Sequence, residues 1–97
     1  MTIRNSAGFE WDRRKAAVNA EKHGILFEEA IRLFDQPFLR IRSDRSGEIR
    51  WTGLGNAQGR IIAVIYTERN GRIRIISARM ARKNEREIYK DRIGVTS

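Results

Sequence analysis

The change of hydrophobic period at Pro37, the single proline of the chain, constrains the fold more than any other feature. Before Pro37, apolar residues recur at the spacing of one helix face. This stripe consists of Phe27, Ala30, Ile31 and Phe34. From Phe38 onward, apolar residues alternate with polar ones or run together, as they do in strands. Helices followed by a series of strands indicate an α+β fold rather than one of alternating strand-helix-strand units.

Two helices are predicted before Pro37. Asp12 can cap a first helix that runs to about His23, and Gly24 follows where a left-handed residue commonly ends a helix. The apolar stripe forms a second amphipathic helix, which Pro37 ends because the residue before a proline disfavours the helical conformation. We expect residues 1–8 to form a flexible leader.

Four strands and a C-terminal helix are predicted after Pro37. The strands lie around Leu39 to Ile41, from Glu48 to about Gly55, from Arg60 to Glu68 and from Arg72 to Ala78, and the helix runs from about Ala81 to Asp91. The pair Asn70-Gly71 is typical of a hairpin turn. Strands in series favour a four-stranded antiparallel sheet, with the helices on one face and the other face free.

The length and composition exclude several classes of protein. A chain of 97 residues has room for one compact domain, so we expect a single domain over residues 1–97. The sequence has no cysteine, no membrane-spanning apolar run and no signal peptide, which predicts a cytoplasmic protein without a membrane partner. It also has no Gly-rich phosphate loop and no metal-binding motif, so we expect neither a cofactor nor a metal.

The charge of the chain indicates a polyanionic partner. The net charge is +8, and 16 of the 20 cationic residues are arginine, whose planar fork of donors suits phosphate and bases. Residues 69–92 hold nine cations against three acidic residues. This distribution favours a nucleic acid over the alternative that the charge only keeps the protein soluble.

A few side chains could carry chemistry on such a surface. His23, the only histidine, stands at a predicted helix end, where it either interacts with the helix dipole or acts as a general acid or base. Lys15, Asn19 and Lys22 share one side of the first helix. The last helix carries Arg82, Glu85, Arg86 and Tyr89 at helical spacing. By default both surfaces are solvated and contribute little to stability.

The chain resembles the BrnT toxin family, which is structurally similar to the RelE-like ribonuclease toxins of bacterial type II toxin-antitoxin pairs. The resemblance covers nearly the whole chain. It is carried by FEWDRRKAAVNAEKHGILFEEAIRLFDQP, by YTERNGRIRIISARMARKNEREIY, and by RWTGLG and GRIIAV between them. Two positions depart from the pattern: Met80 stands where a basic residue is usual, and Arg82 where a helix-capping threonine is usual.

The resemblance implies a RelE-like fold and an endoribonuclease that halts translation until an antitoxin covers its active surface. The implied antitoxin carries a ribbon-helix-helix DNA-binding domain. Such domains are dimers, so we expect a heterotetramer that reaches operator DNA through the antitoxin. The implied substrate is RNA, which is cut without a metal ion.

Metal-free cleavage needs a base for the 2′-hydroxyl proton, donors for the phosphate and an acid for the leaving oxygen. Glu68 is the candidate base, and Arg79 and Arg82 are the candidate phosphate donors. His23 or Tyr89 is the candidate acid. Further RNA contacts are expected from Lys15, Asn19, Lys22, Arg74, Lys83 and Arg86. We expect the arginines, and Arg79 first, to matter more than any proton-transfer group. Arg4 in the leader and Arg45 in the first hairpin turn are the exceptions and should matter little, because a peripheral phosphate contact changes binding only modestly.

Two other kinds of function explain parts of the same pattern. A non-catalytic RNA- or DNA-binding module would also carry a basic last third, and it would shift labelled RNA but leave it intact. An interaction protein that docks a partner on its free sheet face would not arrest growth when it is expressed alone.

Overall fold

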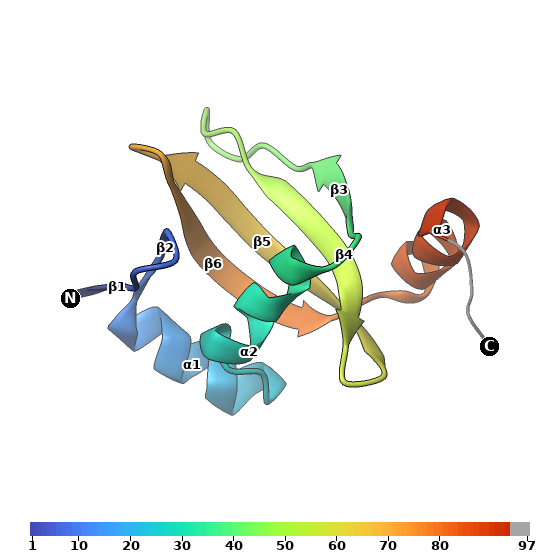
Figure 1. Cartoon of the computed structure of the whole chain (residues 1–97), viewed down its shortest axis with the longest axis horizontal. Helices are drawn as coiled ribbons and strands as arrows, with labels where there is room; N and C mark the ends of the chain where they lie inside the picture. The colour runs from blue at the N-terminus through green and yellow to red at the C-terminus, as the bar shows by residue number, and fades with distance from the viewer. Residues whose placement is uncertain (94–97) are drawn as a thin grey trace.

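The computed structural model describes residues 1–93, and its elements follow the predicted order from Arg13 onward (Figure 1). The helices are α1 (Arg13–His23), α2 (Phe27–Ala30), the 3-10 helix η1 (Ile31–Asp35) and α3 (Lys83–Ile93). The strands are β1 (Thr2–Arg4), β2 (Phe9–Asp12), β3 (Leu39–Arg42), β4 (Trp51–Ala57), β5 (Arg60–Arg69) and β6 (Arg72–Met80). The α+β class is therefore confirmed, whereas residues 94–97 of the expected single domain lie outside the described residues.

The bounds of α1 follow from its two caps. The Asp12 carboxylate accepts a hydrogen bond of 3.0 Å from the backbone N–H of Lys15, and that bond lowers the pKa of Asp12. Gly24 ends the helix in the left-handed region, at φ 69°, and its N–H donates to the carbonyl of Ala20. Both caps satisfy backbone groups that a helix end leaves unpaired.

Within residues 1–93 the sheet has six strands, in the order β1-β2-β6-β5-β4-β3, and not the predicted four. The two additional strands are N-terminal: β1 lies within residues 1–8, where a flexible leader was expected, and β2 directly follows them. Strand β2 pairs in parallel with β6, so the sheet is mixed rather than antiparallel. Burial explains the docking, since Trp11 of β2 is 3% exposed and its ring meets that of Phe27 edge-on.

Hairpins join β3, β4, β5 and β6 in succession. The predicted Asn70-Gly71 turn is present, with φ angles of 50° and 74° between the paired residues Arg69 and Arg72. These are the angles of a two-residue turn whose twist matches that of the strands. Two further turns with positive φ at both residues, Ser46-Gly47 and Gln58-Gly59, close the other hairpins.

Each sheet face carries its own apolar cluster. Ile62, Val64 and Tyr66 pack with α2 and η1, whereas Leu54 and Ala63 pack with α3 on the opposite face. On the first of these faces, η1 packs so closely on the sheet that a Cβ added to Gly55 would lie 2.8 Å from the side chain of Leu33. Figure 1 shows α3 apart from α1 and α2. The expectation of helices on one face only is therefore wrong, because Leu54 of β4 and Ala63 of β5 are apolar residues of the second face and α3 covers them.

Candidate functional site

One face of β6 carries a row of polar side chains that sequence alternation could not place. Arg74, Ser77 and Arg79 pair with Thr67, Ile65 and Ala63 of β5. Directly paired residues lie on the same face of a sheet, and next-nearest residues along a strand share that face. These β6 side chains therefore point to the face that α3 only partly covers, which we call the open face.

A groove of about 340 Å³ runs between α1 and β6 and reaches Ser77. We call it the β6 groove, and its lining is Arg14, Lys15, Val18, Asn19, Lys22, His23, Ile76 and Ser77. Lys15 and Lys22 are exposed, and His23 is half-buried. The structure thus brings His23 together with the cationic side of α1 that the sequence indicated.

Asn19 has a different position from the one its sequence pattern suggested. Its side chain is 5% exposed. The amide accepts from the backbone N–H of Ala78 and donates to the carbonyls of Ala78 and Ile25, at 2.9–3.0 Å. Asn19 therefore pairs with β6 beyond the end of β2 and holds α1 beside the sheet. With its donors and acceptor in use, it is not free to bind RNA.

Arg79 is held at one end of the open face by Glu85 of α3. Its Nη1 and Nη2 donate to the two carboxylate oxygens at 2.7 and 3.0 Å. The hydrogen bond from Arg79 holds the pKa of Glu85 below its usual range. Glu85 also accepts a hydrogen bond of 2.8 Å from the backbone N–H of Arg82. This bond caps α3, although Arg82 stands in place of the usual capping threonine.

Other cations lie around the start of α3. The side chains of Arg82 and Lys83 are exposed. Arg86 is half-buried and donates to the carbonyl of Ala81 at 2.8 Å. The exposed pair can reach a ligand without breaking a contact, whereas Arg79 is bound to Glu85 of α3 and Arg86 to the segment between β6 and α3.

Glu68 and Tyr89 do not join these groups. Glu68 pairs with Ile73, five residues along β5 from Ala63, the partner of Arg79. Because five is an odd number, Glu68 lies on the opposite face from Arg79, at a distance of roughly 16 Å along the strand. It lines a separate cavity of about 370 Å³. Tyr89 is 8% exposed and packs in the apolar cluster beneath α3.

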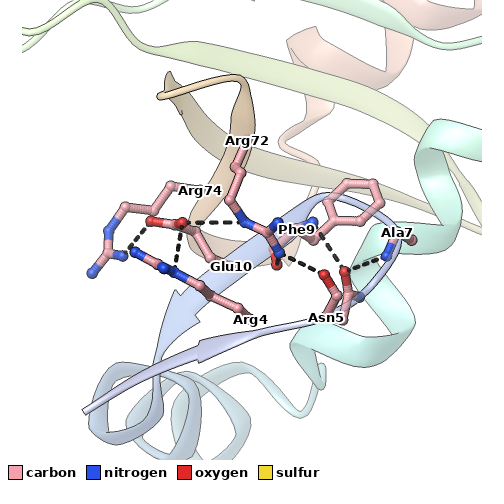
Figure 2. Close-up of polar contacts among 7 residues, drawn as sticks. All are labelled: Arg4, Asn5, Ala7, Phe9, Glu10, Arg72 and Arg74. Atoms are coloured by element: carbon pink, nitrogen blue, oxygen red, sulfur yellow. Dashed lines mark hydrogen bonds and ion pairs between the residues drawn. The ribbon is translucent and has the colours of Figure 1, made fainter.

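Arg74, one of the predicted RNA contacts, belongs to an ion cluster that sequence reasoning missed (Figure 2). Its Nη1 lies 2.9 Å from Oε2 of Glu10, and Oε1 of Glu10 lies 3.5 Å from Arg4 Nε and 3.4 Å from Arg72 Nε. We call these four residues the Glu10 cluster. The Glu10 side chain is 8% exposed. The register of β2 on β6, which sets Glu10 beside Arg74, is what assembles it.

The described part of the chain contains neither a metal-binding cluster nor a membrane-spanning helix. Residues 1–93 contain no group of three His, Cys, Asp or Glu side chains that could share a metal ion. None of the helices among these residues is long and apolar enough to cross a bilayer.

Comparison with known proteins identifies the family. Residues 11–85 match the family model described as "Ribonuclease toxin, BrnT, of type II toxin-antitoxin system". No curated protein matches the chain significantly. The matched range spans α1, the β6 groove and most of the sheet, and it ends at Glu85. The chain belongs to the BrnT family of ribonuclease toxins, which act in type II toxin-antitoxin systems.

Proposed function

We propose that this toxin cuts RNA at the β6 groove without a metal ion and thereby inhibits translation. The observation that carries the proposal is that the only imidazole of the chain, His23, lines the same groove as the ammonium groups of Lys15 and Lys22. Imidazole is the side chain best suited to proton transfer near neutral pH. The cations supply the positive charge that a phosphate requires.

The reaction is attack by the 2′-hydroxyl of RNA on its neighbouring phosphate. The 2′ oxygen forms a bond to phosphorus and gives its proton to His23, and the bond from phosphorus to the 5′ oxygen breaks. The leaving oxygen takes a proton from Lys22 or from water. The products are a 2′,3′-cyclic phosphate and a 5′-hydroxyl end.

Arg79 is the proposed donor to the charge that develops on the phosphate. It lies two residues beyond Ser77 on the open face, roughly 7 Å along the strand. Glu85 fixes the direction of its guanidinium before substrate arrives. A donor that is already oriented stabilises a transition state without reorganisation at the moment of reaction.

The test is incubation of the purified protein with labelled RNA in an excess of chelator. We expect cleavage that is unchanged by the chelator, products with cyclic phosphate ends, and no cleavage of a strand in which every 2′-hydroxyl is replaced by hydrogen. A protein that shifts the RNA but leaves it intact would be a non-catalytic binding module. Cleavage that stops in chelator would refute the metal-free reaction.

The cognate antitoxin is proposed to carry a ribbon-helix-helix domain and to cover the open face with an acidic or strand-forming segment. The support is the exposed cations that lie next to this face, Arg82 and Lys83 at the start of α3 and Lys15 and Lys22 in the β6 groove. A competing polyanion silences such a surface most simply. Two copies of each chain are expected by light scattering, with operator DNA bound through the antitoxin. A complex in which Arg79 and Arg82 keep the solvent exposure that they have in the free toxin would contradict this blocking mechanism.

A further inference from the structure

The Glu10 cluster contains more positive charge than its single carboxylate neutralises. Three guanidinium groups lie within 3.5 Å of a single carboxylate, so the four side chains together carry a charge of +2, three minus one. The carboxylate is almost entirely buried, at 8% exposure. Like charges this close repel one another, and a bound anion would relieve the repulsion.

The three arginines differ in which of their hydrogen-bond donors remain available to a ligand. Nη2 of Arg72 donates to the carbonyls of Asn5 and Phe9, and its Nε is buried, so Arg72 serves the fold. Arg74 contacts Glu10 through Nη1, and Arg4 does so through Nε. Figure 2 shows the guanidinium groups of Arg4 and Arg74 next to each other on one side of Glu10.

We infer that Arg4 and Arg74 form a subsite for a backbone phosphate of the RNA, outside the β6 groove. The inference rests on the proposed function, because it takes RNA as the ligand. Each guanidinium keeps donors beyond those that face Glu10, and two adjacent forks suit the oxygens of one phosphodiester. Glu10 orients both groups, so less order has to be imposed when the phosphate binds.

The position of the subsite fits a strand of RNA that lies along β6. Arg74 shares the open face with Ser77, which borders the β6 groove three residues further on, roughly 10 Å along the strand. The subsite therefore holds a neighbouring nucleotide and not the one that is cut. Arg4 and Glu10 both precede the matched residues 11–85, so the family match does not assign this subsite.

Binding of a labelled 2′-O-methyl RNA strand, which cannot be cut, tests the subsite apart from catalysis. Arg4 is the best position to change, because its side chain is 67% exposed and its loss leaves the core intact. We expect Arg4→Ala to raise Kd about tenfold, with Arg4→Lys in between. The slope of log Kd against log salt should fall by about 0.7, the value for one lost phosphate contact on a single strand.

Arg45→Ala is the matched control, because Arg45 is an exposed arginine in the distant turn between β3 and β4. Arg74→Ala is the second variant, with a larger expected loss of affinity. If Arg4→Ala and Arg45→Ala bind the strand with equal affinity and equal salt slope, the subsite does not exist. Failure of the parent to cut RNA in chelator would instead refute the proposed function and leave this binding result standing.

Discussion

Two shielded carboxylates, Glu10 and Glu85, hold arginines in different proportions. Glu10 gathers the three arginines of its cluster, from β1 and β6, and leaves an excess of positive charge. Glu85 holds Arg79 alone, through two parallel bonds of 2.7 and 3.0 Å, and caps α3 with the same carboxylate. The ratio of arginines to carboxylates is three to one around Glu10 and one to one at Glu85.

The difference teaches how one protein surface can separate binding from chemistry. A one-to-one bidentate pair fixes the direction of a guanidinium but adds no net charge. A cluster of three arginines and one carboxylate has a net positive charge and attracts a phosphate, whichever base its nucleotide carries. Phosphate contacts position a strand but do not recognise its sequence. We therefore expect Arg79 to act on the rate of cleavage, and the Glu10 cluster to act on the affinity for RNA.

The largest effect is expected for Arg79→Ala. Loss of one positioned donor to a developing oxyanion lowers the rate by about a hundred- to a thousandfold. Induction of this variant should no longer arrest growth. Because Glu85 loses its partner, circular dichroism must confirm the fold, and Arg79→Ala combined with Glu85→Ala should be folded and equally inactive. A folded Arg79→Ala protein as toxic as the parent would show that the active site lies elsewhere.

The next largest effect is expected for Glu10→Gln on stability. The substitution leaves three guanidinium groups around a neutral amide, and removal of one partner from a buried ion cluster costs about 3 kcal/mol. Urea unfolding measures this loss, and Glu87→Gln, at an exposed position of α3, is the control. Equal stabilities for the two variants would mean that Glu10 does not hold the cluster together.

A smaller loss is expected for Glu85→Gln, about 1–2 kcal/mol at neutral pH, since glutamine can still accept from the Arg82 N–H. The folded-state pKa of Glu85 lies below its ordinary value of 4.5. Its contribution to stability is therefore fully present above pH 4.5 and is lost as the pH falls through the lowered pKa. The difference in unfolding free energy between parent and Glu85→Gln should shrink on acidification. A difference that stays constant would argue against the ion pair.

The smallest effect is expected for Arg45→Ala. Arg45 is exposed in a turn, away from both carboxylates. Stability, affinity and rate should each stay within about 0.5 kcal/mol of the parent. A large loss of RNA affinity in Arg45→Ala would mean that RNA binding depends on the net charge of the whole protein. The Glu10 cluster would then have no special role in affinity.

Local signals explain what the sequence predicted correctly. The Asp12 cap, Gly24 and the Asn70-Gly71 turn each depend on residues close together in the chain, and all three are present. The parallel pairing of β2 with β6 depends instead on residues about 64 apart, such as Glu10 and Arg74. A four-residue strand has too short a pattern to reveal such a partner.

The candidate site was harder to predict, because it depends on register. Which face of the sheet Glu68 occupies is decided by counting residues from its partner on β6, and a single position reverses the answer. Asn19 has the spacing of a solvated helix face, yet its amide pairs with the edge of β6. The cationic side of α1 was predicted correctly because helical spacing alone places Lys15 and Lys22 together.

The most direct test compares Arg4→Ala with Arg79→Ala in one single-turnover cleavage assay, in chelator, over a range of protein concentrations that saturates the RNA. The account predicts that Arg4→Ala needs about tenfold more protein but reaches the parental rate at saturation. Arg79→Ala should remain slower by about a hundredfold or more, however much protein is added. If both variants recover the parental rate at saturation, or if neither does, the separation of binding from chemistry between the two regions is wrong.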